Sequence, residues 1–210
     1  MANYAETLAY WYLRLNGFFP IDNFVLHDDI SGGGSAPDCD LLAIRLCHTK
    51  ETIGDGDLDK VNLFNPIFSG RLDPAAVDPQ ESYNIGIIAQ VKGGGTSGAR
   101  NAFVEGRVSN GLKRLGFFSS SEIVPTLPNS ISYDLSRGCN ALANGTVIAK
   151  ILFAENPEQS NQFISITLSA ARTFVRNRLH HPDFRDAKRR DWMRFPSDLI
   201  QYLIWEPVTP

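Results

Sequence analysis

Two apolar segments of the chain carry polar residues whose types can do phosphate chemistry. Asp40 stands at the start of an apolar run that continues Leu-Leu-Ala-Ile, and Gln90 and Lys92 close a longer apolar run that begins at Asn84. Side chains alternate along a β-strand, so Gln90 and Lys92 share one face of their strand. If the two strands pair, a carboxylate, an amide and an ammonium converge at one place. Such a set can hold a divalent cation, position a water molecule and offset the charge of a phosphate.

The element that precedes these strands is predicted to be a helix over residues 4–15, because apolar side chains recur at the helical period around most of its circumference. Glu6 falls at the edge of this apolar arc, beside Leu13 and Tyr10. Its carboxylate is therefore expected to be partly desolvated and to need a partner. A metal ion, Lys92 and an arginine of a structural ion pair are the candidate partners.

The remaining pattern predicts an α/β fold. Strands are expected at residues 21–28, 38–46, 84–92, 146–154 and 163–166, and helices at residues 101–115, from the end of the last strand to about 178, and 196–205. No segment has the composition of a linker, so residues 1–210 are expected to form one mixed α/β domain. Its core is predicted within about residues 1–154, and residues 155–210 are expected to form a helical, basic C-terminal extension.

The order and spacing of these residues resemble the PD-(D/E)xK nuclease superfamily, in its restriction-endonuclease-like, Mrr-type form with Q-x-K. The motifs that carry the resemblance are Asp40-Leu41-Leu42, Gln90-x-Lys92 and the helical Glu6, over about the first half of the chain. The resemblance implies an αβββαβ core with a mixed sheet flanked by helices. It also implies that Asp40 and Glu6 bind Mg²⁺ or Mn²⁺ together with Gln90. Lys92 would be the catalytic lysine, and Asp38 is an alternative to Asp40.

For the whole protein, the resemblance implies a metal-dependent phosphodiesterase, in the first place a DNA endonuclease. Gln90 departs from the commoner pattern, since a neutral amide is a weaker ligand for a hard cation than a carboxylate is. This departure supports a second interpretation, in which the fold is a catalytically inactive module that binds nucleic acid or a protein partner. DNA is favoured over RNA. A homodimer and a subunit of a larger system are both compatible with the sequence.

Charge is distributed unevenly along the chain. The formal net charge of -3 argues against a protein that coats nucleic acid indiscriminately. Residues 172–194 nevertheless hold eight basic and three acidic residues, a net charge of +5, so that the rest of the chain carries -8. Such a stretch is typical of a localised phosphate contact and equally of a solvated helix face. The candidate nucleic-acid-binding residues are Arg100, Arg107, Arg114, Arg172, Arg176, Lys188, Arg189 and Arg190.

A glycine pattern directly after the strand predicted at residues 84–92 suggests a different interpretation. Gly93-x-Gly95-x-x-Gly98 has the spacing of a dinucleotide-binding loop and stands between a predicted strand and a predicted helix. The acidic residue that such a loop requires about twenty residues further on is missing near Phe117. A small-molecule enzyme that uses this loop is therefore a third and weaker interpretation, which nucleotide-dependent thermal stabilisation would reveal.

Cysteine content and hydropathy indicate the cellular compartment in which the protein is expected. The three cysteines are odd in number and lack CxxC spacing, so a disulfide framework and a zinc knuckle are not indicated. The first residues lack a basic targeting segment, and no apolar run is long enough to cross a bilayer. A soluble, cytoplasmic protein without membrane contact is the expectation.

Overall fold

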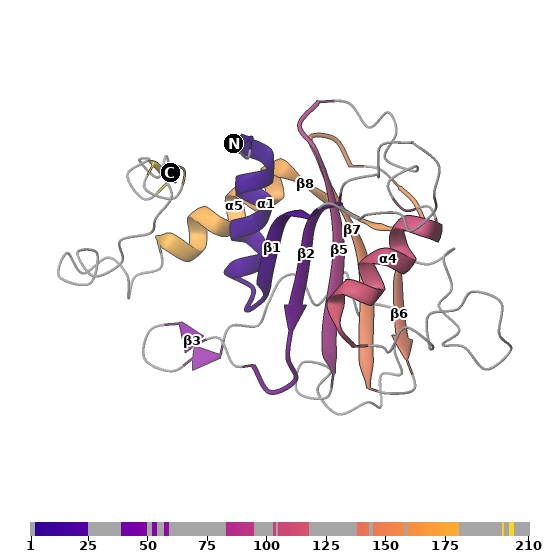
Figure 1. Ribbon diagram of the computed structural model, residues 1–210. Coiled ribbons are helices and arrows are strands. Elements are labelled where there is room, and N and C mark those ends of the chain that lie inside the picture. Colours follow the sequence, from indigo (N-terminus) through magenta and orange to yellow (C-terminus); the bar gives the residue numbers. More distant parts are fainter. Residues whose placement is uncertain are drawn as a thin grey trace, which may run out of the picture.

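A computed structural model of the protein shows a six-stranded mixed sheet with helices on both faces (Figure 1). It describes residues 3–24, 39–49, 52–53, 57–58, 83–94, 103, 105–117, 138–142, 145–157, 159–180, 199 and 202–203. The helices are α1 (Tyr4–Arg14), α4 (Glu105–Leu115) and α5 (Leu168–Leu179), and the strands are β1 (Phe19–Phe24), β2 (Cys39–Arg45), β3 (Thr52–Ile53), β4 (Asp57–Leu58), β5 (Asn84–Lys92), β6 (Cys139–Leu142), β7 (Thr146–Ala154) and β8 (Ile164–Thr167).

The sheet has the order β1-β2-β5-β7-β6, with β8 paired to the later half of β7. β5 and β8 run parallel to β7, whereas the pairs β1–β2, β2–β5 and β6–β7 are antiparallel. β3 and β4 form a separate two-stranded sheet. The predicted α/β class, with a mixed sheet flanked by helices, is confirmed at this level. Within the described ranges, no helix is long and apolar enough to cross a membrane.

Local pattern places most of the described elements correctly. β5 and β7 coincide with the strands predicted at residues 84–92 and 146–154, since both are long runs of apolar and β-branched residues. β1 begins earlier than predicted, because Pro20 is tolerated in an edge strand, where a missing backbone N–H costs no ladder hydrogen bond. The expected end of this strand, and most of the helix predicted at residues 196–205, lie outside the described residues.

α1 and α5 cover one face of the sheet together. The ring of Tyr12 in α1 meets the ring of Phe174 in α5 edge to face, with 4.9 Å between centroids, and that of Phe153 in β7 with 5.6 Å. Burial in this contact raises the pKa of the Tyr12 phenol. β8 and α5, which the sequence analysis assigned to a C-terminal extension, therefore belong to the same sheet and core as α1.

α4 covers the opposite face and lies directly on β5. Its buried side chains are Val108, Leu112 and Leu115, the apolar stripe of an amphipathic helix. Glycines at the contact allow this close approach. A Cβ added at Gly111 would stand 2.9 Å from Ile88 Cδ1, and one added at Gly86 would stand 2.8 Å from Leu115 Cδ1. The two faces of the sheet are thus packed by different helices.

Candidate functional site

The pairing of β2 with β5 brings Asp40 and Gln90 together. Leu41 is opposite Ala89 in this antiparallel pair, so the register places Asp40 beside Gln90. Oδ2 of Asp40 accepts a hydrogen bond from the backbone N–H of Val91 at 2.6 Å and another from Nε2 of Gln90. Asp40 is half-buried and Gln90 is buried. The predicted pairing of the two strands is confirmed, and a carboxylate and an amide meet at the end of β5.

Lys92 lies on the same face of the sheet as this contact. Leu42 and Ile88 belong to the core cluster under α4, and side chains alternate along a strand. Gln90 and Lys92 therefore share the α4 face with Ile88. Lys92 is half-buried. In the sequence of β5, Lys92 comes two residues after Gln90, whose amide contacts Asp40.

Glu6 has a partner that the sequence analysis did not consider. Asn3 is the N-cap of α1, and the two residues form a capping box. Oε1 of Glu6 accepts from the Asn3 side-chain amide at 2.7 Å, Oε2 accepts from the Asn3 backbone N–H at 3.2 Å, and the Glu6 N–H donates to Asn3 Oδ1 at 3.0 Å. Among the described residues, Glu6 therefore bonds to Asn3 and not to Lys92 or an arginine. α1 covers the face of the sheet opposite to the one that carries Asp40, Gln90 and Lys92, so the expected meeting of Glu6 with these residues is not seen, although Ala5 lies near Gly93 after β5.

The donor atoms at Asp40 are a minimal set for a divalent cation. The described residues contain no cluster of three or more His, Cys, Asp or Glu side chains that could hold a metal ion. Mg²⁺ usually keeps several waters and takes only one or two protein carboxylates. Rotation of the Gln90 amide about its last bond would turn Oε1, instead of Nε2, toward Asp40. Asp40 with Gln90 thus fits a sparse Mg²⁺ or Mn²⁺ site, and Asp38 lies outside the described residues.

A second lysine on the α4 face is completely buried. Lys150 stands in the middle of β7, opposite Ile88 of β5, and its Nζ lies 5.9 Å from the centroid of the Phe103 ring. A polar side chain in such a place is costly to desolvate, and its contact with the Phe103 ring is one of the interactions that hold it. The α4 face therefore carries two lysines on adjacent strands, of which Lys92 alone is accessible to a substrate.

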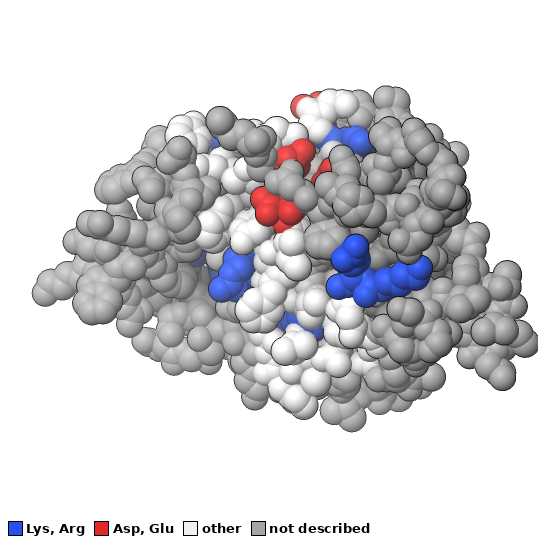
Figure 2. Space-filling model, in the orientation of Figure 1, with Lys and Arg blue, Asp and Glu red and all other residues white. Residues whose placement is uncertain are grey.

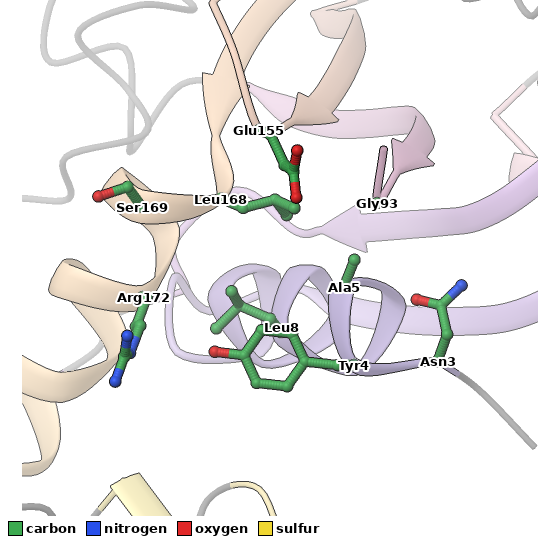
Figure 3. A pocket seen from close by; sticks show the side chains of 9 residues that line it. All are labelled: Asn3, Tyr4, Ala5, Leu8, Gly93, Glu155, Leu168, Ser169 and Arg172. Carbon is green, nitrogen blue, oxygen red and sulfur yellow. The ribbon is translucent and has the colours of Figure 1, made fainter. Parts of the chain in front are cut away.

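A cavity of about 420 Å³ opens on the other face of the sheet, at the same end of β5 (Figure 3). Its lining comes from the first turns of α1 and α5 and from the residues that follow β5 and β7. The lining residues are Asn3, Tyr4, Ala5, Leu8, Gly93, Glu155, Leu168, Ser169 and Arg172. In Figure 3, Glu155 and Leu168 point toward α1, whereas Tyr4 and Arg172 lie on the opposite side of the opening. We refer to this space as the α1/α5 cavity.

The predicted basic residues fall into separate places. Arg172 lines the α1/α5 cavity, and Arg176 lies one helical turn further along α5. Arg114 is exposed and lies away from Lys92, because the neighbouring Leu115 packs near Gly86, about 20 Å along β5 from Lys92 at the usual rise per residue. The side chain of Arg107 and the whole of Arg100, Lys188, Arg189 and Arg190 lie outside the described part of the chain.

The charged side chains on the surface also form separate groups (Figure 2). Acidic side chains gather over the upper ends of β1 and β2, the strands that carry Asp22 and Asp40, and a basic side chain reaches the surface close beside them. A separate basic group lies lower, over α4, whose last turn holds Lys113 and Arg114. Arg178, part of the expected basic stripe, is buried and so cannot belong to an exposed phosphate-binding surface.

The sequence analysis did not single out two residues that the structure brings to attention, Glu155 and Lys150, although a feature of the sequence marks each of them. Glu155 follows directly after β7, the parallel neighbour of β5, and the end of a strand in a parallel pair is a common place for functional side chains. Lys150 interrupts the apolar run of residues 146–154, and a lysine in a buried strand requires a specific partner. The spacing Asn3-x-x-Glu6 could also have predicted the capping box.

Comparisons with protein-family models, with curated protein sequences and with solved structures found no match to this chain.

Proposed function

We propose that the protein is a metal-dependent nucleic-acid phosphodiesterase, in the first place a DNA endonuclease. One observation carries the proposal, namely that Asp40 meets Gln90 and the Val91 N–H at the end of two paired strands. Lys92 stands on the same strand face, close to the surface. Carboxylate, amide and ammonium groups in this arrangement are suited to phosphodiester hydrolysis.

The order of the elements supports the same proposal. Along the chain, α1 is followed by β1, β2, the two short strands β3 and β4, β5, α4, β6 and β7. β5 and β7 are parallel neighbours, so α4 lies in the connection between them and packs on one face of the sheet. This order is compatible with the αβββαβ core that the resemblance implies, with β3, β4, β6, β8 and α5 as additions.

Each group of the site has a role in this mechanism. Asp40 and the amide oxygen of Gln90 would hold Mg²⁺ or Mn²⁺, which supplies charge that activates water and offsets a phosphate oxygen. Lys92 positions the attacking water and stabilises the charge that develops on the phosphate. The N–H of Val91 fixes the orientation of the Asp40 carboxylate through their hydrogen bond. Glu6 holds the first turn of α1 near the end of β5.

Two contacts favour the second interpretation, a module that binds nucleic acid or a partner without cleaving. Gln90 donates its N–H to Asp40, which occupies a carboxylate oxygen that a metal would need. Glu6 is engaged by Asn3 and would have to leave its capping box to bind a cation. A site in which both groups keep these partners would not turn over substrate.

The deciding experiment is nicking of supercoiled plasmid with Mn²⁺ or Mg²⁺. We expect nicking by the wild-type protein, none with EDTA, and a loss of about a hundredfold or more in Lys92→Ala, because Lys92 acts on the transition state. Lys113→Ala removes an exposed lysine of α4 and is the matched control. Absence of nicking by folded wild-type protein would contradict the endonuclease proposal and support the module.

Gln90→Glu tells the two interpretations apart at the site itself. A carboxylate is the stronger ligand for a hard cation, so in an enzyme the variant is expected to nick plasmid at lower Mg²⁺ concentration than the wild type. In a non-catalytic module the same change would place two carboxylates side by side without creating activity. The measurement is the Mg²⁺ concentration that gives half-maximal nicking, with the thermal melting temperature as a check on folding.

A further inference from the structure

The α1/α5 cavity lies next to the proposed catalytic groups but on the other face of the sheet. Gly93, which lines the cavity, directly follows Lys92 in the chain, and Ala5, which also lines it, is the neighbour of Glu6. The opening and Lys92 therefore lie at the same end of β5, one residue apart in the chain. We propose that the cavity takes a single unpaired nucleotide of the bound strand, next to the phosphate that is cleaved. This inference rests on the proposed function and specifies its substrate.

The size and the apolar lining of the cavity suit a base. Its volume of about 420 Å³ falls in the range of pockets that hold small molecules. Ala5, Leu8 and Leu168 provide an apolar wall, and the ring of Tyr4 lines the opening with 52% of its surface exposed. Stacking of bases on aromatic rings is a general means of binding single strands, because every base offers a flat face.

The charges of the cavity suit the other parts of a nucleotide. Arg172 brings a guanidinium to one side, where it can pair with a phosphate. Glu155 is exposed on the other side and points toward α1, so its carboxylate can accept hydrogen bonds from base N–H groups (Figure 3). A cation and an acceptor on opposite sides of an apolar wall match a ligand with a phosphate at one end and a base at the other.

An unpaired nucleotide fits this site better than a duplex does. The cavity lies between the first turns of two helices and is partly open to solvent, so a base of a single strand can enter it from the surface. Bringing a base out of a duplex costs a few kcal/mol, whereas a base in a single strand is already available. The cavity therefore favours single-stranded or unpaired nucleic acid over continuous duplex.

Binding without cleavage tests the inference. Fluorescence anisotropy in EDTA would compare a short single-stranded DNA with the duplex of the same sequence. Tyr4→Ala and Arg172→Ala are each expected to bind the single strand about fivefold to a hundredfold more weakly than the wild type does, which is the usual range for loss of one stacked base or phosphate contact. Their affinity for the duplex should not change. Tyr4→Phe keeps the ring and is expected to retain the wild-type affinity.

The matched control is Arg14→Ala. Arg14 lies at the other end of α1, 5.7 Å from the centroid of the Phe19 ring, and its loss removes one positive charge away from the cavity. Single-strand binding at wild-type affinity by both Tyr4→Ala and Arg172→Ala would overturn the inference. So would equal weakening for single strand and duplex, or a mononucleotide that binds as tightly as the oligonucleotide. Plasmid nicking together with any of these results would leave the proposed function standing and remove only the cavity from it.

Discussion

The two faces of the sheet differ most at the end of β5. On the α4 face, glycines at the helix–strand contact let α4 approach β5 closely, and the polar groups of Asp40, Gln90 and Val91 bond to one another. On the α1/α5 face, two helices begin at the same edge and leave a cavity between their first turns. The groups proposed for catalysis thus lie on one face of the sheet, and the cavity lies on the other.

Of the changes that test this comparison, removal of the Asp40 carboxylate is expected to have the largest effect, a loss of Mn²⁺ affinity. Asp40→Asn keeps an oxygen that can accept the Val91 N–H but loses the negative charge. Mn²⁺ affinity should fall by more than about a hundredfold, since even partners of metal ligands contribute ten- to a hundredfold. Isothermal titration with Mn²⁺ measures it, and Asp22→Asn on the neighbouring strand is the control. Unchanged Mn²⁺ affinity in Asp40→Asn would remove the metal from the α4 face.

The close approach of α4 can be tested at Gly86. An added Cβ would stand 2.8 Å from Leu115 Cδ1 and 2.9 Å from Ile148 Cδ1, both in the packed core. Gly86→Ala is therefore expected to lower the free energy of unfolding by about 1–3 kcal/mol, the usual cost of overpacking. Urea denaturation measures it. Gly94→Ala, whose Cβ would meet nothing within 4 Å, should stay within about 0.5 kcal/mol of the wild type. Equal stability of the two variants would show that α4 is not packed tightly against β5 at Gly86.

The α1/α5 face can be probed through Tyr12. Burial raises the pKa of its phenol above the ordinary value of 10.0, so the folded state favours the protonated form. The contribution of this group to stability is complete below pH 10.0 and is lost as pH rises above it, by about 1.4 kcal/mol per pH unit at most.

Tyr12→Phe removes the ionisable group and keeps the ring in its contacts with Phe153 and Phe174. Urea unfolding at pH 11 should therefore show a smaller alkaline loss of stability for the variant than for the wild type. The same pair compared at pH 8, below this window, is the control and should differ little. Identical alkaline losses would mean that Tyr12 is not held in a dry contact between α1 and α5.

The sequence predicted the position of some residues of the proposed catalytic site and not of others. Asp40, Gln90 and Lys92 could be placed together because two apolar strands carried them at fixed positions, and the pairing of β2 with β5 agrees. Glu6 lies in the predicted helix, but this helix covers the other face of the sheet, and Glu6 forms a capping box with Asn3 that the spacing Asn3-x-x-Glu6 could have indicated. Arg114 shared a helix with the expected phosphate-binding residues and lies at the far end of β5.

The sequence by itself determined the class of the fold and the strands that carry Asp40, Gln90 and Lys92. Alternation and apolar runs are local properties, so residues 84–92 and 146–154 read as strands without knowledge of their neighbours. Only the tertiary structure decided that β8 and α5 complete the sheet and core, that Lys150 is buried among the residues under α4, and that four separate segments enclose the α1/α5 cavity. These features depend on which surfaces pack against one another, and contacts between residues far apart in the chain leave no periodic trace in it.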